Sequence, residues 1–220
     1  MKRILIILFL FPACLIAQDT TSAFSFGFLF SNDICSRISK AEGSTADLKQ
    51  RFDSLEDVSY GYTAGIILSR SFNRNLSLHS GLNYSDRGYS IDTLSEVDLT
   101  NVKFHYRYLE VPLRVVYVFS AQKKIRPFVS LGLNFGYLLQ AKTKYNQIGQ
   151  ATEPSFNNSD ELIRFNLGVS ASVGIEKSIN TKYKFGVEIL VRQSLLSISN
   201  SPLQRMLNSA GVCISFARKF

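Results

Sequence analysis

Four charged residues at matching spacings are the first groups in this sequence that could do chemistry. Glu110 and Arg114 lie in one segment of alternating apolar residues, and Glu188 and Arg192 lie in another. In a strand, residues an even number apart point to the same face. If the two segments cross a barrel in opposite directions, Glu110 reaches the height of Arg192, and Arg114 reaches that of Glu188. We predict two ion pairs across the interior, because an unpaired charge there would be costly.

A third pair is expected where the chain makes a tight turn. Glu176 and Lys184 flank this turn and would face each other inside the same barrel. Together, the six residues form a predicted lumen charge network. An ion or proton path is the functional alternative, but filling and stabilising the interior accounts for the same side chains.

Catalytic chemistry has less support in the sequence. His79 and His105 are its only histidines. Some membrane barrels modify lipids with a Ser-His-acid group near the rim, where the nucleophile needs an adjacent base. His105 has Ser90, Asp92 and Asp98 in the segment before it, so a lipid-modifying enzyme stays open as an alternative. No spacing identifies such a group, and the cysteines and histidines form no metal-ligand pattern. We expect no enzyme activity, no cofactor and no metal.

The elements that must position these residues are strands with two different faces. From residue 163 to residue 176, apolar and polar or small residues alternate without an error. The apolar set is Ile163, Phe165, Leu167, Val169, Ala171, Val173 and Ile175. Strands of soluble proteins usually have about five or six residues, whereas a tilted strand that crosses a bilayer needs roughly nine to eleven. The length favours a membrane strand.

Eight such segments can be followed along the chain. They cover residues 22–33, 59–72, 76–89, 103–119, 127–142, 162–178, 182–195 and 209–220. Short and long connections alternate between them, as in an outer-membrane barrel with short turns on one side and long loops on the other. We predict an all-β fold, an eight-stranded antiparallel transmembrane up-and-down β-barrel with a side-chain-filled lumen and no open pore. A soluble exported lipocalin-like barrel, with the apolar face inside around a ligand, is the structural alternative.

The N-terminus indicates the compartment. Residues 1–17 contain a short basic start, an apolar run and small residues before Gln18, which is typical of a secretory signal peptide. A retained helix and a lipoprotein site at Cys14 are weaker alternatives. We expect residues 18–220 to form one barrel domain in the outer membrane of a Gram-negative cell envelope, with both termini in the periplasm. Cys35 and Cys213 would lie too far apart to form a disulfide.

The net charge of +8 is spread unevenly. Basic residues gather in the expected tight turns and the tail, at Arg74, Lys123, Lys124, Arg126, Arg218 and Lys219. The first two expected outer loops are mildly acidic. A nucleic-acid role would require a basic stripe with interleaved aromatic residues on one soluble face, and the sequence has none.

A family resemblance rests on two short motifs. Residues 108–113 read YLEVPL, and Arg126-Pro127-Phe128-Val129 follows a tight turn. With these motifs the chain resembles the PorT-like outer-membrane β-barrel family of Bacteroidetes. The resemblance implies an outer-membrane barrel but fixes no activity, and the named member of that family assists a protein-secretion system. Because proline removes a ladder donor, Pro112 suggests a local bulge or an amide position that faces no partner.

The C-terminus and the loops suggest the partners. Phe216 and Phe220 share one face, and a terminal aromatic on an amphipathic last strand resembles the signal read by the barrel insertion machinery. Outer-membrane lipid would surround the apolar face. The long segments 34–58 and 141–161 would contact an envelope or secretion protein partner, so we expect a structural or interaction role and no nucleic-acid partner.

Overall fold

The computed structural model describes most of the chain beyond the N-terminus. The described residues are 24–40, 56–94, 99–119, 124–147, 155–157, 162–199 and 204–220. The expected signal peptide, residues 1–17, lies outside them. Within the described ranges, no helix has the length and apolar character that a membrane crossing by a helix would require.

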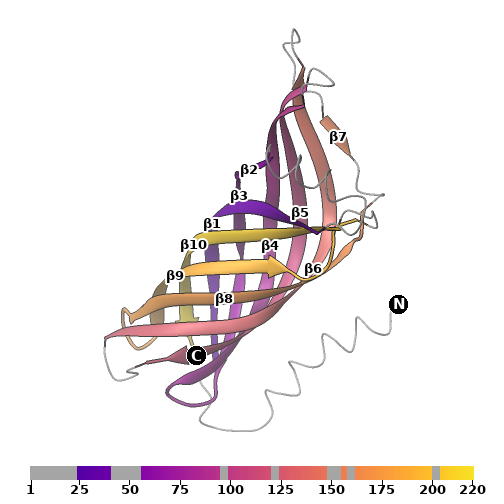
Figure 1. The fold of residues 1–220 in the computed structure, drawn as a ribbon. Coiled ribbons are helices and arrows are strands. Elements are labelled where there is room, and N and C mark those ends of the chain that lie inside the picture. Colours follow the sequence, from indigo (N-terminus) through magenta and orange to yellow (C-terminus); the bar gives the residue numbers. More distant parts are fainter. Residues whose placement is uncertain are drawn as a thin grey trace.

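Eight long strands form a closed antiparallel ring. They are β1 (Phe24–Lys40), β3 (Ser59–Ser71), β4 (Leu76–Leu94), β5 (Leu99–Val118), β6 (Ile125–Gln147), β8 (Phe165–Ser178), β9 (Tyr183–Ser194) and β10 (Gln204–Lys219). Their order around the ring is β4-β3-β1-β10-β9-β8-β6-β5, and the pairing of β4 with β5 closes it (Figure 1). Two short strands, β2 (Glu56–Asp57) and β7 (Ser155–Asn157), pair with β4 and β6. The predicted eight-stranded antiparallel barrel is confirmed.

The strand registers show how strongly the barrel is sheared. A path of paired residues starts at Ser25 on β1 and returns to β1 at Cys35, ten residues further along. It runs through Ser69, His79, Arg114, Gly132, Ser170, Arg192 and Ser209. This stagger accompanies the strand tilt of about 35–45° that closed barrels need. Polar side chains from distant strands thus share one inner wall.

The outer and inner faces of the barrel wall differ in polarity. On β8, Val169 and Val173 are exposed on the outside, whereas Ser170 and Ser172 are buried on the inside. The same division holds on the other strands, with exposed apolar residues such as Phe28, Leu131, Ile189 and Val212. An outside wall of apolar side chains suits acyl chains, and the inverted lipocalin-like arrangement is wrong for this chain.

Several strands extend further than the sequence pattern predicts. β1 continues to Lys40, β4 and β5 form a hairpin from Leu76 to Val118, and β6 continues to Gln147. The segments 34–58 and 141–161, expected as loops, therefore begin as strand. On β4, β5 and β6 the residues on the outside of these extensions are no longer apolar, so the alternation that marks a membrane strand stops before the strand does. On β1, Ile34 and Ile38 remain apolar and exposed beyond the expected strand end. Figure 1 shows β4, β5 and β6 rising beyond the rest of the ring.

Two ends of the barrel can be distinguished. The terminal rim holds Phe220 and the turns at residues 72–75 and 179–182. The distal end is formed by the extensions of β4, β5 and β6. At the distal end the lumen is filled by apolar residues, which corrects the expectation of a polar interior throughout. They are Tyr89, Ile91, Val102, Tyr106, Tyr108, Leu138, Ala141, Ile198 and Leu207.

The strand register is regular at Pro112 but shifts further along the same strand pair. β5 passes Pro112 without a bulge, because Ser80 pairs with Leu113 and Asn83 with Glu110 in one register. A register shift lies instead on β6, where Leu138 pairs with Tyr108 but Gln140 pairs with Arg107. This β-bulge adds one residue to β6 and changes which residues of the strand face outward.

Candidate functional site: a charge network across the lumen

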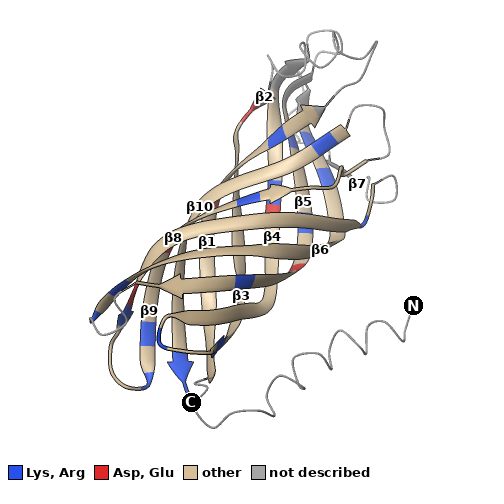
Figure 2. Cartoon of the chain, turned by 60° about the horizontal axis from the view of Figure 1, so that its bottom comes forward, with Lys and Arg blue, Asp and Glu red and all other residues tan. Residues whose placement is uncertain are grey.

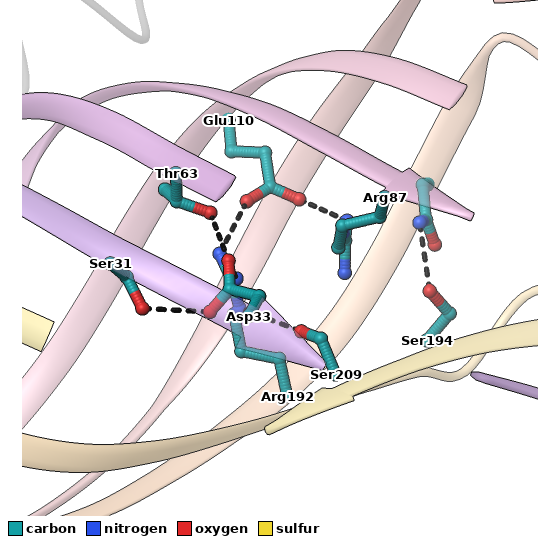
Figure 3. A network of polar contacts seen from close by, with 9 residues as sticks. Ser31, Asp33, Thr63, Arg87, Glu110, Arg192, Ser194 and Ser209 are labelled. Atoms are coloured by element: carbon teal, nitrogen blue, oxygen red, sulfur yellow. Dashed lines mark hydrogen bonds and ion pairs between the residues drawn. The ribbon is translucent and has the colours of Figure 1, made fainter. Parts of the chain in front are cut away.

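The most buried charged residues of the barrel meet near the distal half of the lumen. Arg192 on β9 contacts Asp33 on β1 at 2.5 Å and Glu110 on β5 at 3.4 Å. Arg87 on β4 pairs with the other oxygen of Glu110. The four side chains come from four strands and point toward one another in Figure 3. Each residue is at most 3 % exposed, so two carboxylates and two guanidinium groups balance inside the protein.

Hydroxyl groups complete the hydrogen bonding of this distal tier. The Oγ of Ser31 donates to Asp33 at 2.7 Å, and the Oγ1 of Thr63 donates to the second oxygen of Asp33 at 2.8 Å. The Nε of Arg192 donates to the Oγ of Ser209 at 3.1 Å. Buried carboxylates are tolerated when their lone pairs are satisfied in this way.

A second pair crosses the lumen below the first. The Nη1 of Arg114 on β5 lies 3.0 Å from both carboxylate oxygens of Glu188 on β9. The Oγ of Ser172 also donates to Glu188 at 2.5 Å, and Ser130 bonds Ser172 at 2.7 Å. This middle tier connects two strands that are not neighbours in the ring, since β6 and β8 lie between β5 and β9.

Small residues make room for the charged side chains. A Cβ atom added at Gly132 would lie 2.7 Å from the Cγ of Arg114, and one at Gly174 would lie 2.7 Å from the Cβ of Glu188. At Gly211 the added atom would lie 2.2 Å from an oxygen of Asp33. An eight-stranded interior is just wide enough for side chains to fill, so glycine on the wall sets where the ion pairs fit.

The third tier borders a cavity that opens at the terminal rim. Glu176 on β8 lies 2.9 Å from Arg126 on β6 and 3.9 Å from Lys184 on β9. These three residues and His79 line a cavity of about 480 Å³. The lumen is thus open at the terminal rim, and the ion pairs of the middle and distal tiers lie further up.

The sequence-predicted network residues are brought together by the structure. Glu110 lies beside Arg192, Arg114 beside Glu188, and Glu176 beside Lys184. Sequence reasoning missed Asp33 and Arg87, which complete the distal tier. The sequence does carry a signal for both: each lies an odd number of residues from the apolar positions of its own strand, so its side chain is expected to point into the lumen.

The candidate catalytic residues His105, Ser90 and His79 form hydrogen bonds with other groups. The Nδ1 of His105 contacts Asp86 at 3.1 Å on the outside of the barrel. The Ser90 hydroxyl donates to the main-chain oxygens of Asp57 and Val58 at 3.4 and 3.3 Å instead. The side chains of Asp92 and Asp98 lie outside the described part. His79 points into the lumen near the terminal rim, where its Nε2 lies 3.3 Å from the Oγ of Ser77.

The remaining predicted groups lie on the wall. Cys35 and Cys213 are buried free thiols on β1 and β10. Phe216 and Phe220 are exposed on the outside at the terminal rim, and the main-chain amide of Phe220 bonds the oxygen of Phe24 at 2.9 Å. Within the described ranges, no three His, Cys, Asp or Glu side chains gather closely enough to hold a metal ion.

Comparisons with known proteins agree on the architecture. The family described as "Outer membrane protein beta-barrel domain" matches residues 16–200. The structure is similar to that of Neisserial surface protein A, with 11% identity, a TM-score of 0.52, and coverage of 90% of this chain and 99% of that one. It is also similar to OprG from Pseudomonas aeruginosa, with 16% identity, a TM-score of 0.52, and coverage of 90% and 96%. These likenesses show the fold alone. No curated protein matches the chain in sequence.

Proposed function

This chain belongs to the outer membrane protein β-barrel domain family, and from this membership we propose that it is a sealed outer-membrane barrel with a structural and interaction role. The observation that carries the proposal is the buried ion pairing across the lumen. Arg192 holds carboxylates of two other strands, and Arg114 holds Glu188 from across the ring. Moving a solute along the axis would require these buried charges to separate, at a cost of several kcal/mol each.

The orientation is part of the proposal. The terminal rim faces the periplasm and the distal end faces the cell exterior. Short turns at the terminal rim support this, because outer-membrane barrels place their short turns on the periplasmic side. Basic residues near that rim, such as Arg74, Lys124 and Lys182, are exposed and suit a position beside lipid phosphates.

The distal end is the proposed interaction surface. Strands β4, β5 and β6 extend beyond the ring, and β2 and β7 add short edges to them. The segments 34–58 and 141–161 start from this platform and would contact an envelope or secretion protein. The narrower resemblance to the PorT-like family makes a secretion partner the more specific form of this proposal.

Crosslinking in living cells tests the interaction role. A photoreactive amino acid at exposed Val58 near the distal end should capture a discrete protein partner. The same group at exposed Asn180, in a turn of the terminal rim, is the matched control. A partner captured at Val58 and absent at Asn180 supports the proposal. Equal capture at both positions, or none at any position of the distal surface, contradicts it.

A further inference from the structure

A polar cluster lies on the outside of the barrel, where the neighbouring strands present apolar side chains. Asp86 on β4 contacts the Nδ1 of His105 at 3.1 Å and the Nε of Arg107 at 3.3 Å, both on β5. Arg107 also donates from its Nη1 to the Oε1 of Gln140 on β6 at 3.0 Å. The Asp86 side chain is only 10% exposed, whereas that of Arg107 is 36% exposed. The carboxylate therefore holds an imidazole and a guanidinium group on the surface of the wall.

Three lysines extend this cluster upward on the same face. Lys142 pairs with His105, and Lys144 pairs with Lys103, so their side chains share the outer side of β5 and β6. The β6 bulge beside Leu139 is what turns Gln140, Lys142 and Lys144 outward. We call Asp86, Lys103, His105, Arg107, Gln140, Lys142 and Lys144 the distal basic patch.

The patch begins where the apolar band of the barrel ends. Immediately below it on the same face lie Tyr84, Leu109 and Tyr137. At the terminal rim, Tyr117 is the corresponding aromatic residue on β5, ten residues from Arg107. Ten residues of a strand tilted by about 40° span roughly 25 Å along the barrel axis, which is the height of the lipid-facing band in such proteins. Arg107 thus lies at the level of the lipid headgroups.

The charges of the patch are not cancelled within the protein. Among the described residues, no carboxylate lies within ion-pair distance of Lys103, Lys142 or Lys144. Both oxygens of Asp86 are already in contact with His105 and Arg107. Four permanent cations face one carboxylate, so the surface retains net positive charge. Figure 2 shows basic residues on the upper parts of the strands as well as near the terminal rim.

We propose that the distal basic patch binds the phosphate groups of a phosphorylated glycolipid in the outer leaflet. This inference rests on the proposed orientation, which places the distal end outside. The planar guanidinium of Arg107, held by Asp86 and Gln140, is pre-oriented to bind phosphate oxygens. The three lysines add positive charges further toward the distal end of the barrel. The acyl chains of the same lipid would lie against Leu109 and the tyrosines directly below.

Charge reversal at the lysines tests the site. The variant carries Lys103→Glu, Lys142→Glu and Lys144→Glu, and its matched control carries Lys124→Glu, Lys177→Glu and Lys182→Glu near the terminal rim. All six lysines but Lys142 are exposed, and both variants change the net charge equally. Heat-modifiable gel mobility establishes that each variant folds. The probes are purified diphosphorylated lipid A, its enzymatically dephosphorylated form, and phosphatidylglycerol, added to the detergent-folded barrel and followed by native mass spectrometry.

The wild type and the control should retain diphosphorylated lipid A, and the distal variant should bind it at least about tenfold more weakly, because three cations that face the lipid phosphates become anions. Dephosphorylated lipid A and phosphatidylglycerol should bind more weakly to the wild type. Equal binding by the distal variant and the wild type would overturn the site. Equal binding of phosphatidylglycerol would overturn the assignment to a glycolipid. The partner crosslinked at Val58 is a separate readout, so failure of either proposal can be recognised alone.

Discussion

Replacement of Arg192 by methionine is the sharpest test of the lumen network. Arg192 is 3 % exposed and contacts Asp33, Glu110 and Ser209. Methionine fills much of the same volume but leaves Asp33 buried without a counter-ion, while Glu110 keeps Arg87. Removing one partner of a buried ion pair costs about 3–5 kcal/mol, so we expect a loss of that size in the free energy of unfolding.

The assay must suit a chain that contains no tryptophan. Urea unfolding of the barrel in lipid vesicles can be followed by the fraction that keeps the mobility of the folded form on unheated gels. Arg74→Met is the matched control, because Arg74 is exposed at the terminal rim and should change little. Adding Asp33→Asn to Arg192→Met should recover part of the loss, since the buried charge is then removed. Equal stability of Arg192→Met and Arg74→Met would refute the reasoning.

Three further predictions concern the wall and the lumen. Val169→Arg should lower the free energy of unfolding by roughly 2–4 kcal/mol in vesicle urea titrations if the residue faces the bilayer midplane, and full tolerance would contradict the lipid-facing assignment. Gly211→Val should reduce the folded yield on unheated gels, because an added Cβ would lie 2.2 Å from an oxygen of Asp33; an unchanged yield would argue against a tight fit. The buried thiols Cys35 and Cys213 should react with a water-soluble maleimide only after unfolding, and rapid labelling of the folded barrel, read by mass spectrometry, would contradict a closed lumen.

Much of the fold could be predicted because each strand has one apolar and one polar face. The alternation from Ile163 to Ile175 predicts a strand and shows which of its faces is apolar. Counting residues along two antiparallel strands then predicts that Glu110 and Arg192 lie at the same level in the lumen. The lengths of the connections add the antiparallel order. These signals are local, so one sequence is enough to find them.

What could not be predicted lies mostly at the distal end. There the outward residues of β4, β5 and β6, such as His105 and Arg107, are polar, so the apolar alternation stops while the strands continue. The β6 bulge beside Leu139 reverses the parity of the following residues, and nothing in the local sequence marks it. The apolar alternation therefore predicts a strand end at Lys142 and gives no sign of the patch that the bulge creates.

Spin labels at two neighbouring positions of β8 test the central claim most directly. Val173 is 56% exposed on the outside, and Ser172 is 8% exposed inside. In lipid vesicles, a nitroxide at Val173 should collide readily with oxygen dissolved among the acyl chains. A nitroxide at Ser172 should be shielded from oxygen and immobilised by its neighbours. The opposite pattern, with the label at Ser172 in lipid and the label at Val173 packed inside, would contradict the account.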